Sequence, residues 1–131
     1  PTEHPVVLID YPSFVNCLAK EKQPVGFIPN VADTTQIAVH YSERWELYCR
    51  GIELANCYSE ETNQNRIKEY YKTETPLKAK NIVQHTCDKN YYKIFTDFPA
   101  CSGVAMGVDR LIALLANCKS INSILPFPLT P

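Results

Sequence analysis

The hydrophobic positions in the first 40 residues form short runs separated by turn-forming residues. Residues 6–9 (Val-Val-Leu-Ile) form a continuous apolar run, which predicts a buried strand that Asp10, Tyr11 and Pro12 should end. Proline, glycine and asparagine gather in residues 20–35 and predict a loop. Residues 37–40 alternate weakly and favour a short strand.

Residues 44–54 carry the clearest local pattern in the chain. A two-residue turn at Arg50-Gly51, with Gly51 at positive φ, would pair the flanking positions as a β-hairpin. This register collects the apolar side chains on one face, whereas sliding the turn by one residue mixes apolar and acidic side chains. The opposite face then carries Glu46, Tyr48 and Glu53.

The remaining pattern predicts helices and one more strand. Ser59 is expected to cap a polar helix that runs to about Tyr71 and is ended by Pro76. Residues 77–100 leave room for one more short helix. Small residues over 102–106 predict a strand, and the apolar spacing from Val108 predicts a helix with one apolar face. The resulting fold class is α+β, an antiparallel β-sheet flanked by helices in a single domain over residues 1–131.

Composition narrows the classes of function. The chain has 131 residues, 45% apolar and 21% charged, which is typical of a globular domain. Its net charge of −1 predicts no strong nucleic-acid binding by this segment. No apolar run approaches the ~20 residues of a membrane span, and no signal-peptide pattern opens the chain. Six cysteines without a CxxC pair and three scattered histidines argue against zinc, and we expect reduced thiols in a cytoplasmic protein.

Glu46 and Glu53 are the first candidate for chemistry. On the predicted hairpin they are diagonal neighbours on one face, and two carboxylates held that close favour a cation between them. Mg²⁺ takes oxygen ligands from one or two carboxylates together with nucleotide phosphates. The same two residues also suit an exposed, solvated polar face.

The second candidate is the segment 101–111, in which a small-residue strand leads into a helix that begins near Arg110. Small residues allow a ligand to lie against the strand, and a helix N-terminus with a guanidinium favours a phosphate. The segment is neither a GxGxxG nor a P-loop motif. The alternative is a packed strand and an arginine paired with an acid.

The third candidate is the segment 53–60, in which an amide, a phenol and acids are dense enough to recognise an amino acid. Asn56 lies on the wrong face of a regular strand, so this interpretation requires a bulge or loop there. The alternative is a capped turn that leads into a helix.

Together these segments resemble the class II lysyl-tRNA synthetases. Residues 46–56 with Tyr58 and Glu60 resemble the lysine-site segment, and residues 103–110 (Gly-Val-Ala-Met-Gly-Val-Asp-Arg) resemble motif 3. The opening residues 10–12 and 18–20 also match, so the resemblance runs almost from end to end. Residues 101–103 (Cys-Ser-Gly) and Ala105, in place of the usual glycine, resemble the branch that attaches lysine to elongation factor P.

The resemblance implies a reaction and a set of roles. ATP and lysine, or a lysine analogue, would form lysyl-adenylate, and the acceptor would be elongation factor P or tRNA. Glu46 and Glu53 would hold Mg²⁺ on ATP, and Arg110 would be the catalytic residue that contacts the γ-phosphate. Gly107 would also border ATP. The residues implied for the amino-acid site are Asn56, Tyr58, Glu60, Gly103 and Ala105.

The chain also departs from the family pattern. Phe14, Cys57 and Glu61 replace glutamate, glycine and leucine, and motifs 1 and 2 are absent from these residues. Motif 2 supplies the arginine that grips the α-phosphate, so this chain alone is expected to be inactive. A partial domain should also expose a sheet edge, which predicts a homo-oligomer or a missing N-terminal half as partner. The alternative function is a non-catalytic module that binds a nucleotide, an amino acid or a protein.

Overall fold

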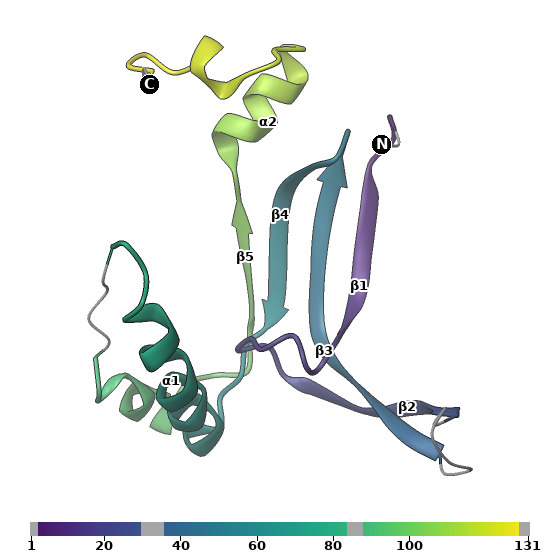
Figure 1. The fold of residues 1–131 in the computed structure, drawn as a ribbon, viewed down its shortest axis with the longest axis vertical. Coiled ribbons are helices and arrows are strands. Elements are labelled where there is room, and N and C mark those ends of the chain that lie inside the picture. Colours follow the sequence, from purple (N-terminus) through teal and green to yellow (C-terminus); the bar gives the residue numbers. More distant parts are fainter. Residues whose placement is uncertain (1–2, 30–35, 84–87, 129–131) are drawn as a thin grey trace. The chain divides into compact units, whose positions relative to one another are not determined.

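A computed structural model of the chain describes residues 3–29, 36–83 and 88–128 (Figure 1). Strands dominate the first half of the chain, and most elements of the second half are helical. The elements in chain order are β1 (Val6–Pro12), β2 (Glu21–Pro29), β3 (Gln36–Cys49), β4 (Ile52–Ser59), α1 (Gln64–Lys78), η1 (Tyr91–Thr96), β5 (Ser102–Met106), α2 (Val108–Leu115) and η2 (Ile121–Ser123).

The five strands form one sheet in the order β1-β3-β4-β5, and β2 pairs with β3 outside this path. Neighbouring strands run in opposite directions (Figure 1). Strands β1 and β3 are joined through β2, and β4 and β5 are separated in sequence by α1 and η1, so no βαβ unit is present among the described elements. The predicted α+β class with an antiparallel sheet is therefore confirmed.

Strand β2 corrects the prediction of a loop over residues 20–35. Residues 21–29 pair antiparallel with β3, from Glu21 opposite Ser42 to Pro29 opposite Gln36. The register shifts between Lys22 and Gly26. Pro24, which has no N–H to donate, lies within this irregular part of the strand. Residues 30–35 of the predicted loop lie outside the described residues.

Strand β1 also differs from the prediction. The strand continues through residues 10–12 instead of ending before them, and Asp10 adopts a φ of 57°. Its apolar run is exposed rather than buried, with 65% of Ile9 accessible to solvent. The reason is its position: β1 is the outer strand of the sheet path, and an apolar run alone does not reveal whether another layer covers it.

The predicted hairpin turn at Arg50-Gly51 is confirmed. Strand β3 ends at Cys49 and β4 begins at Ile52, so two residues form the loop. Arg50 has a φ of 52° and Gly51 a φ of 78°. Two positive φ values are typical of the type I′ turn, whose twist matches the flanking strands. The register that separates the acidic face from the apolar face follows from this turn.

Helix α1 begins and ends later than predicted. Its N-cap is Asn63, whose side chain accepts hydrogen bonds from the backbone of Asn65 and Arg66, while Ser59 stays in β4. Pro76 lies inside the last turn, and the helix continues to Lys78. Proline has no N–H, so the ladder loses the hydrogen bond from position 76 to the oxygen of Lys72 close to the end of the helix.

The strand β5 and the helix α2 have the predicted bounds. Helix α2 ends in a Schellman motif, in which Cys118 N–H donates to Ala113 O at 2.8 Å and Asn117 N–H donates to Leu114 O at 3.1 Å. Asn117 adopts the left-handed conformation that this motif requires, with a φ of 54°. The short helix expected within residues 77–100 is the 3₁₀ helix η1.

The chain divides into two compact units, each with a small core of its own. The first comprises residues 1–9, 45–57 and 104–131, and its buried apolar residues are Cys49, Leu54, Ala55 and Ala113. The second comprises residues 10–44 and 58–103, where Ala19 and Ile67 are buried. That residues 1–131 act as one segment of a catalytic domain stays a prediction.

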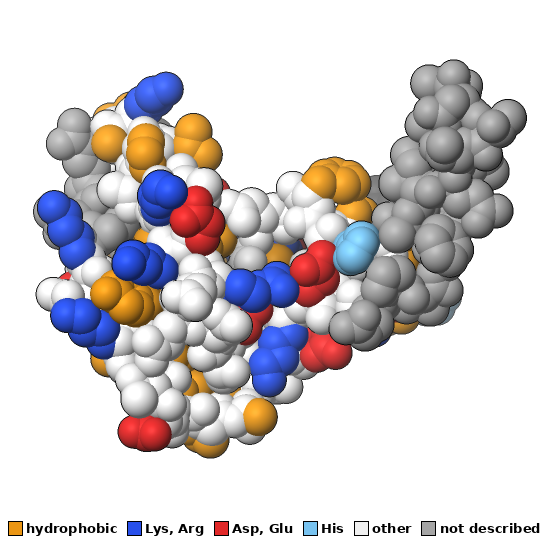
Figure 2. Space-filling view, turned by 90° about the horizontal axis from the view of Figure 1, so that it is seen from below, with side chains coloured by type: hydrophobic (Ala, Val, Ile, Leu, Met, Phe, Trp, Pro, Cys, Tyr) orange, Lys and Arg blue, Asp and Glu red, His pale blue; other side chains and the backbone are white. Residues whose placement is uncertain are grey.

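Charged side chains of both signs are interspersed on the face seen in Figure 2. In the second unit Arg66 pairs with Glu61 at 2.8 Å and with Glu21 at 3.2 Å, and Glu21 lies 3.2 Å from His40. Within the part of the chain that the structure describes, no helix is long and apolar enough to cross a membrane.

Candidate functional site

A cavity of about 360 Å³ lies in the first unit, where β4, β5 and the start of α2 meet. Five of the residues singled out in the sequence line it, although they come from segments about 50 residues apart. Those five are Glu53, Asn56, Ala105, Gly107 and Arg110; Leu54, Ala55, Met106, Asp109 and Ile121 complete the lining.

The Asn56 amide and the Glu53 carboxylate meet beside this cavity. Asn56 Nδ2 donates a hydrogen bond of 3.2 Å to Glu53 Oε1. Positions 53 and 56 would lie on opposite faces of a regular strand, and the consecutive residues Leu54 and Ala55 are both buried. The hydrogen bond joins two side chains that are three positions apart on β4, and the bulge or loop that the amino-acid-site interpretation of Asn56 requires stays a prediction.

Glu46 occupies the hairpin face expected from the turn register. It is buried, with 5% of its surface exposed, and Tyr48 OH donates a hydrogen bond of 2.6 Å to its Oε2. The two residues are two positions apart on β3 and therefore share a face. Burial does not fit the alternative of a solvated surface glutamate at this position.

Arg110 folds back from the first turn of α2 onto β4. Its Nη1 donates a hydrogen bond of 2.9 Å to the backbone oxygen of Glu53. Gly107 makes room for this path, because a Cβ there would lie 3.1 Å from Arg110 Cδ. The backbone N–H of Gly107 donates to Leu54 O at 2.8 Å, which ties the start of α2 to β4. The guanidinium is thus held against the backbone of Glu53, and both residues line the cavity.

The predicted Mg²⁺ site consists of two carboxylates, those of Glu46 and Glu53. Among the described residues, no group of three or more His, Cys, Asp or Glu side chains could hold a metal ion. Carboxylate oxygens are the donors that Mg²⁺ prefers, and Glu46 and Glu53 each accept a hydrogen bond, from Tyr48 and Asn56 respectively.

The second unit holds the other predicted amino-acid-site residues, Tyr58, Glu60 and Gly103. Arg44 reaches Tyr58 there, with its guanidinium carbon 5.3 Å from the ring centroid and 4.3 Å from that of Tyr11. The sequence did not identify this contact. A cation–π pair between residues 14 or more positions apart leaves no local pattern.

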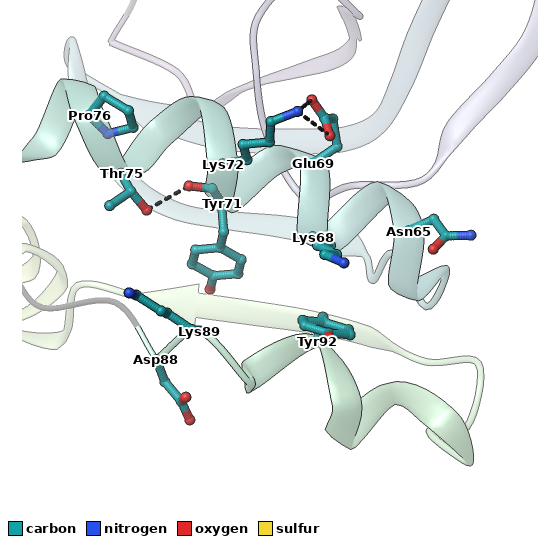
Figure 3. A pocket seen from close by; sticks show the side chains of 10 residues that line it. All are labelled: Asn65, Lys68, Glu69, Tyr71, Lys72, Thr75, Pro76, Asp88, Lys89 and Tyr92. Carbon is teal, nitrogen blue, oxygen red and sulfur yellow. Dashed lines mark hydrogen bonds and ion pairs between the residues drawn. The ribbon is translucent and has the colours of Figure 1, made fainter.

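A further cavity, of about 740 Å³, lies between α1 and η1 and was not foreseen (Figure 3). Tyr71 points from α1 toward the segment that carries Lys89, and Tyr92 lies on η1 facing Lys68, whose Nζ is 5.3 Å from its ring centroid. Three lysines, at positions 68, 72 and 89, line the same space, and Lys72 is paired with Glu69 at 3.2 Å. The only sequence signal for this cavity is the spacing of Lys68 and Lys72, which lie four positions apart and therefore on the same face of α1.

Comparison with known proteins identifies the family. A sequence model for "tRNA synthetases class II (D, K and N)" matches residues 2–131. The chain belongs to this family. Curated class II relatives include an elongation factor P (R)-β-lysine ligase homolog from Aquifex aeolicus, 33% identical over 119 residues that make up 91% of this chain. The ligases of Yersinia enterocolitica and Buchnera aphidicola are 35% and 36% identical over 66% and 67% of it.

These relatives are much longer than the segment they share with this chain. The match covers 33% of the Aquifex protein, 27% of the Yersinia protein and 28% of the Buchnera protein. The resemblance to the class II synthetases and to the lysyl-tRNA synthetase-like ligase branch is confirmed by these matches. The roles of individual residues stay predictions.

Proposed function

We propose that this chain forms part of the active site of an ATP-dependent ligase that activates lysine or β-lysine for transfer to elongation factor P. The cavity in the first unit carries the proposal, since it brings Glu53, Asn56 and Arg110 together from two distant segments. The names of the relatives supply the amino acid and the acceptor.

The phosphate end of the substrate would be held by the first unit. Glu46 and Glu53 would hold Mg²⁺, which when bound neutralises charge on the nucleotide phosphates. Arg110 would add a guanidinium with several donors, one of which already fixes its position on Glu53 O. Alignment and charge stabilisation of this kind are the main contributions of protein to phosphoryl and adenylyl transfer.

The roles at the amino-acid end follow from the family resemblance. Asn56 and Tyr58 would border the carboxylate of the amino acid, and Glu60 would pair with the side-chain ammonium. Ala105 lines the cavity of the first unit, where its methyl group would narrow the space for substrate.

Calorimetry on the 131-residue chain tests the proposal directly. We expect ATP to bind only with Mg²⁺, and lysine or β-lysine to bind with Glu60 intact and not in Glu60→Ala. Loss of a charge-assisted hydrogen bond of about 1.5–3 kcal/mol corresponds to at least a tenfold loss of affinity. Lysine-dependent exchange of pyrophosphate into ATP should be absent, because the α-phosphate arginine of motif 2 is absent from these residues.

Two results would change this conclusion. Pyrophosphate exchange by the chain alone would show that it carries a complete site. Failure to bind both ATP and lysine in the presence of Mg²⁺ would instead favour the alternative, a synthetase-like module that binds another protein.

A further inference from the structure

Gly103 and Glu60 are in direct van der Waals contact in the second unit. A Cβ built on Gly103 would collide with Glu60 Oε1 and would lie 3.3 Å from Glu60 Cδ. Gly51, not Gly103, is the glycine with positive φ among the described residues, so the backbone at 103 suits any L-residue. A Cβ at position 103 would therefore displace the Glu60 carboxylate, the flexible end of a side chain, and would not strain its own backbone.

The backbone around Glu60 is fixed from two sides. Its N–H donates to Cys101 O at 3.0 Å, and it forms a bridge with Ala19 on the other side. The neighbouring N–H of Glu61 donates to Leu18 O at 2.9 Å. A side chain at position 103 could not be accommodated by moving this backbone, so the Glu60 side chain would have to rotate away.

Glu60 and its neighbour Glu61 differ in what holds their carboxylates. Glu61 is buried, pairs with Arg66 at 2.8 Å and accepts hydrogen bonds from the backbone N–H groups of Thr62 and Asn63. None of the hydrogen bonds and ion pairs among the described residues involves the half-buried Glu60 carboxylate. A half-buried charge without a partner favours a cationic ligand, so Glu61 is structural and Glu60 is open to substrate.

We propose that Gly103 is a positioning and specificity-determining residue, which fixes the Glu60 carboxylate where it meets the side-chain ammonium of the amino-acid substrate. This inference rests on the proposed function, in which Glu60 binds that ammonium. Any side chain at position 103 displaces the carboxylate and lowers affinity for a substrate with a terminal ammonium, while affinity for ATP is unchanged.

The first measurement uses calorimetry to determine the affinity of the full chain for lysine in the presence of Mg²⁺ and ATP. Gly103→Ala should weaken lysine binding by about tenfold or more, because a charge-assisted hydrogen bond is lost. Gly103→Ala should keep the affinity for ATP within about twofold of the wild-type value, far less than the tenfold loss expected for lysine. Ser102→Ala is the matched control, since it changes the adjacent exposed residue and should leave lysine affinity unchanged.

The second measurement needs no ligand and uses a double-mutant cycle in urea. Gly103→Ala should lower the urea midpoint when Glu60 is present and should have little effect in a Glu60→Ala background, because the colliding carboxylate is then gone. A cooperative urea transition of the Gly103→Ala single variant shows that this chain still folds.

The outcomes separate the inference from the function on which it rests. Lysine binding without coupling between positions 60 and 103, or wild-type lysine affinity in Gly103→Ala, overturns the positioning role alone. Coupling in urea without lysine binding by the wild-type chain overturns the proposed function, and with it the assignment of the ammonium as the ligand.

Discussion

Arg50 Nη1 donates a hydrogen bond of 2.8 Å to Asn117 Oδ1, and both residues have positive φ. Arg50 lies at the tip of the β3–β4 hairpin, and Asn117 follows Ala116, the C-cap residue of α2. The bond therefore links the far end of α2 to the hairpin that carries Glu46 and Glu53, while Arg110 links the near end to Glu53.

Variants of Asn117 should separate the two roles of this residue. Asn117→Gly keeps the left-handed cap and loses only an exposed hydrogen bond, so it should change the free energy of unfolding by less than about 1 kcal/mol. Asn117→Ala loses the bond and forces an alanine to positive φ, which should cost about 1–2 kcal/mol. Urea unfolding followed by circular dichroism measures both, and equal losses in the two variants would contradict this division.

Glu46→Gln and Glu53→Gln should each weaken ATP binding sharply, and only when Mg²⁺ is present. The double variant should cost little more than one single variant, because an ion held by both carboxylates is lost at the first substitution. Calorimetry with and without Mg²⁺ measures the effect, and Glu43→Gln, on the same strand, is the control. Additive losses, or equal losses without metal, would show that the two carboxylates act separately.

Arg110→Ala should weaken ATP binding and leave AMP binding unchanged, because its proposed contact is the γ-phosphate and AMP has none. Arg110→Lys keeps the charge but not the planar set of donors, so it should recover only part of the affinity. Nucleotide titrations that compare ATP, ADP and AMP test this order. Equal weakening of ATP and AMP would assign Arg110 instead to holding the backbone of Glu53.

The chain should lose stability above pH 10 in part through Tyr70. Burial, followed by the charge of Glu74, raises the pKa of the Tyr70 phenol above its ordinary value of 10.0. The unfolded state therefore loses the Tyr70 proton at a lower pH than the folded state does. The contribution of Tyr70 to the free energy of unfolding is fully present below pH 10 and is lost as the pH rises through the pKa of the folded state.

Tyr70→Phe removes that titration, so its urea midpoint should fall less between about pH 8 and about pH 11 than that of the wild-type chain. Tyr91→Phe, which removes a hydroxyl from the same run of aromatic contacts, is the matched control. An identical fall in Tyr70→Phe and the wild-type chain would contradict the assignment to this phenol.

Local sequence signals predicted the elements that local chemistry determines. The Arg50-Gly51 turn, the small-residue strand β5 and the amphipathic helix α2 follow from turn geometry and periodicity within a few residues. Strand β2 was missed because proline and glycine punctuate it, and its existence depends on the partner strand β3. The helix start was placed at Ser59 and not at Asn63, since both residue types cap helices and strand pairing decides between them.

The sequence predicted which residues belong to the candidate site, but it did not predict which other residues they contact. Glu53, Asn56 and Arg110 were selected by residue type and by resemblance, and the structure places them around one cavity. The contacts of Arg44 with Tyr58 and of Gly103 with Glu60 join residues many positions apart. Contacts of this kind depend on how the whole chain folds, and no periodicity or spacing encodes them.

The two-residue turn at Arg50-Gly51 also has a consequence for the order in which the site forms during folding. Glu46 and Glu53 lie on the two strands of one hairpin, and hairpins form in about 1–10 μs. Arg110 joins Glu53 across 57 positions, so it must wait for the closure of a long loop that includes α1. If the proposed roles hold, we expect the two carboxylates to be in place before the guanidinium of Arg110 joins Glu53.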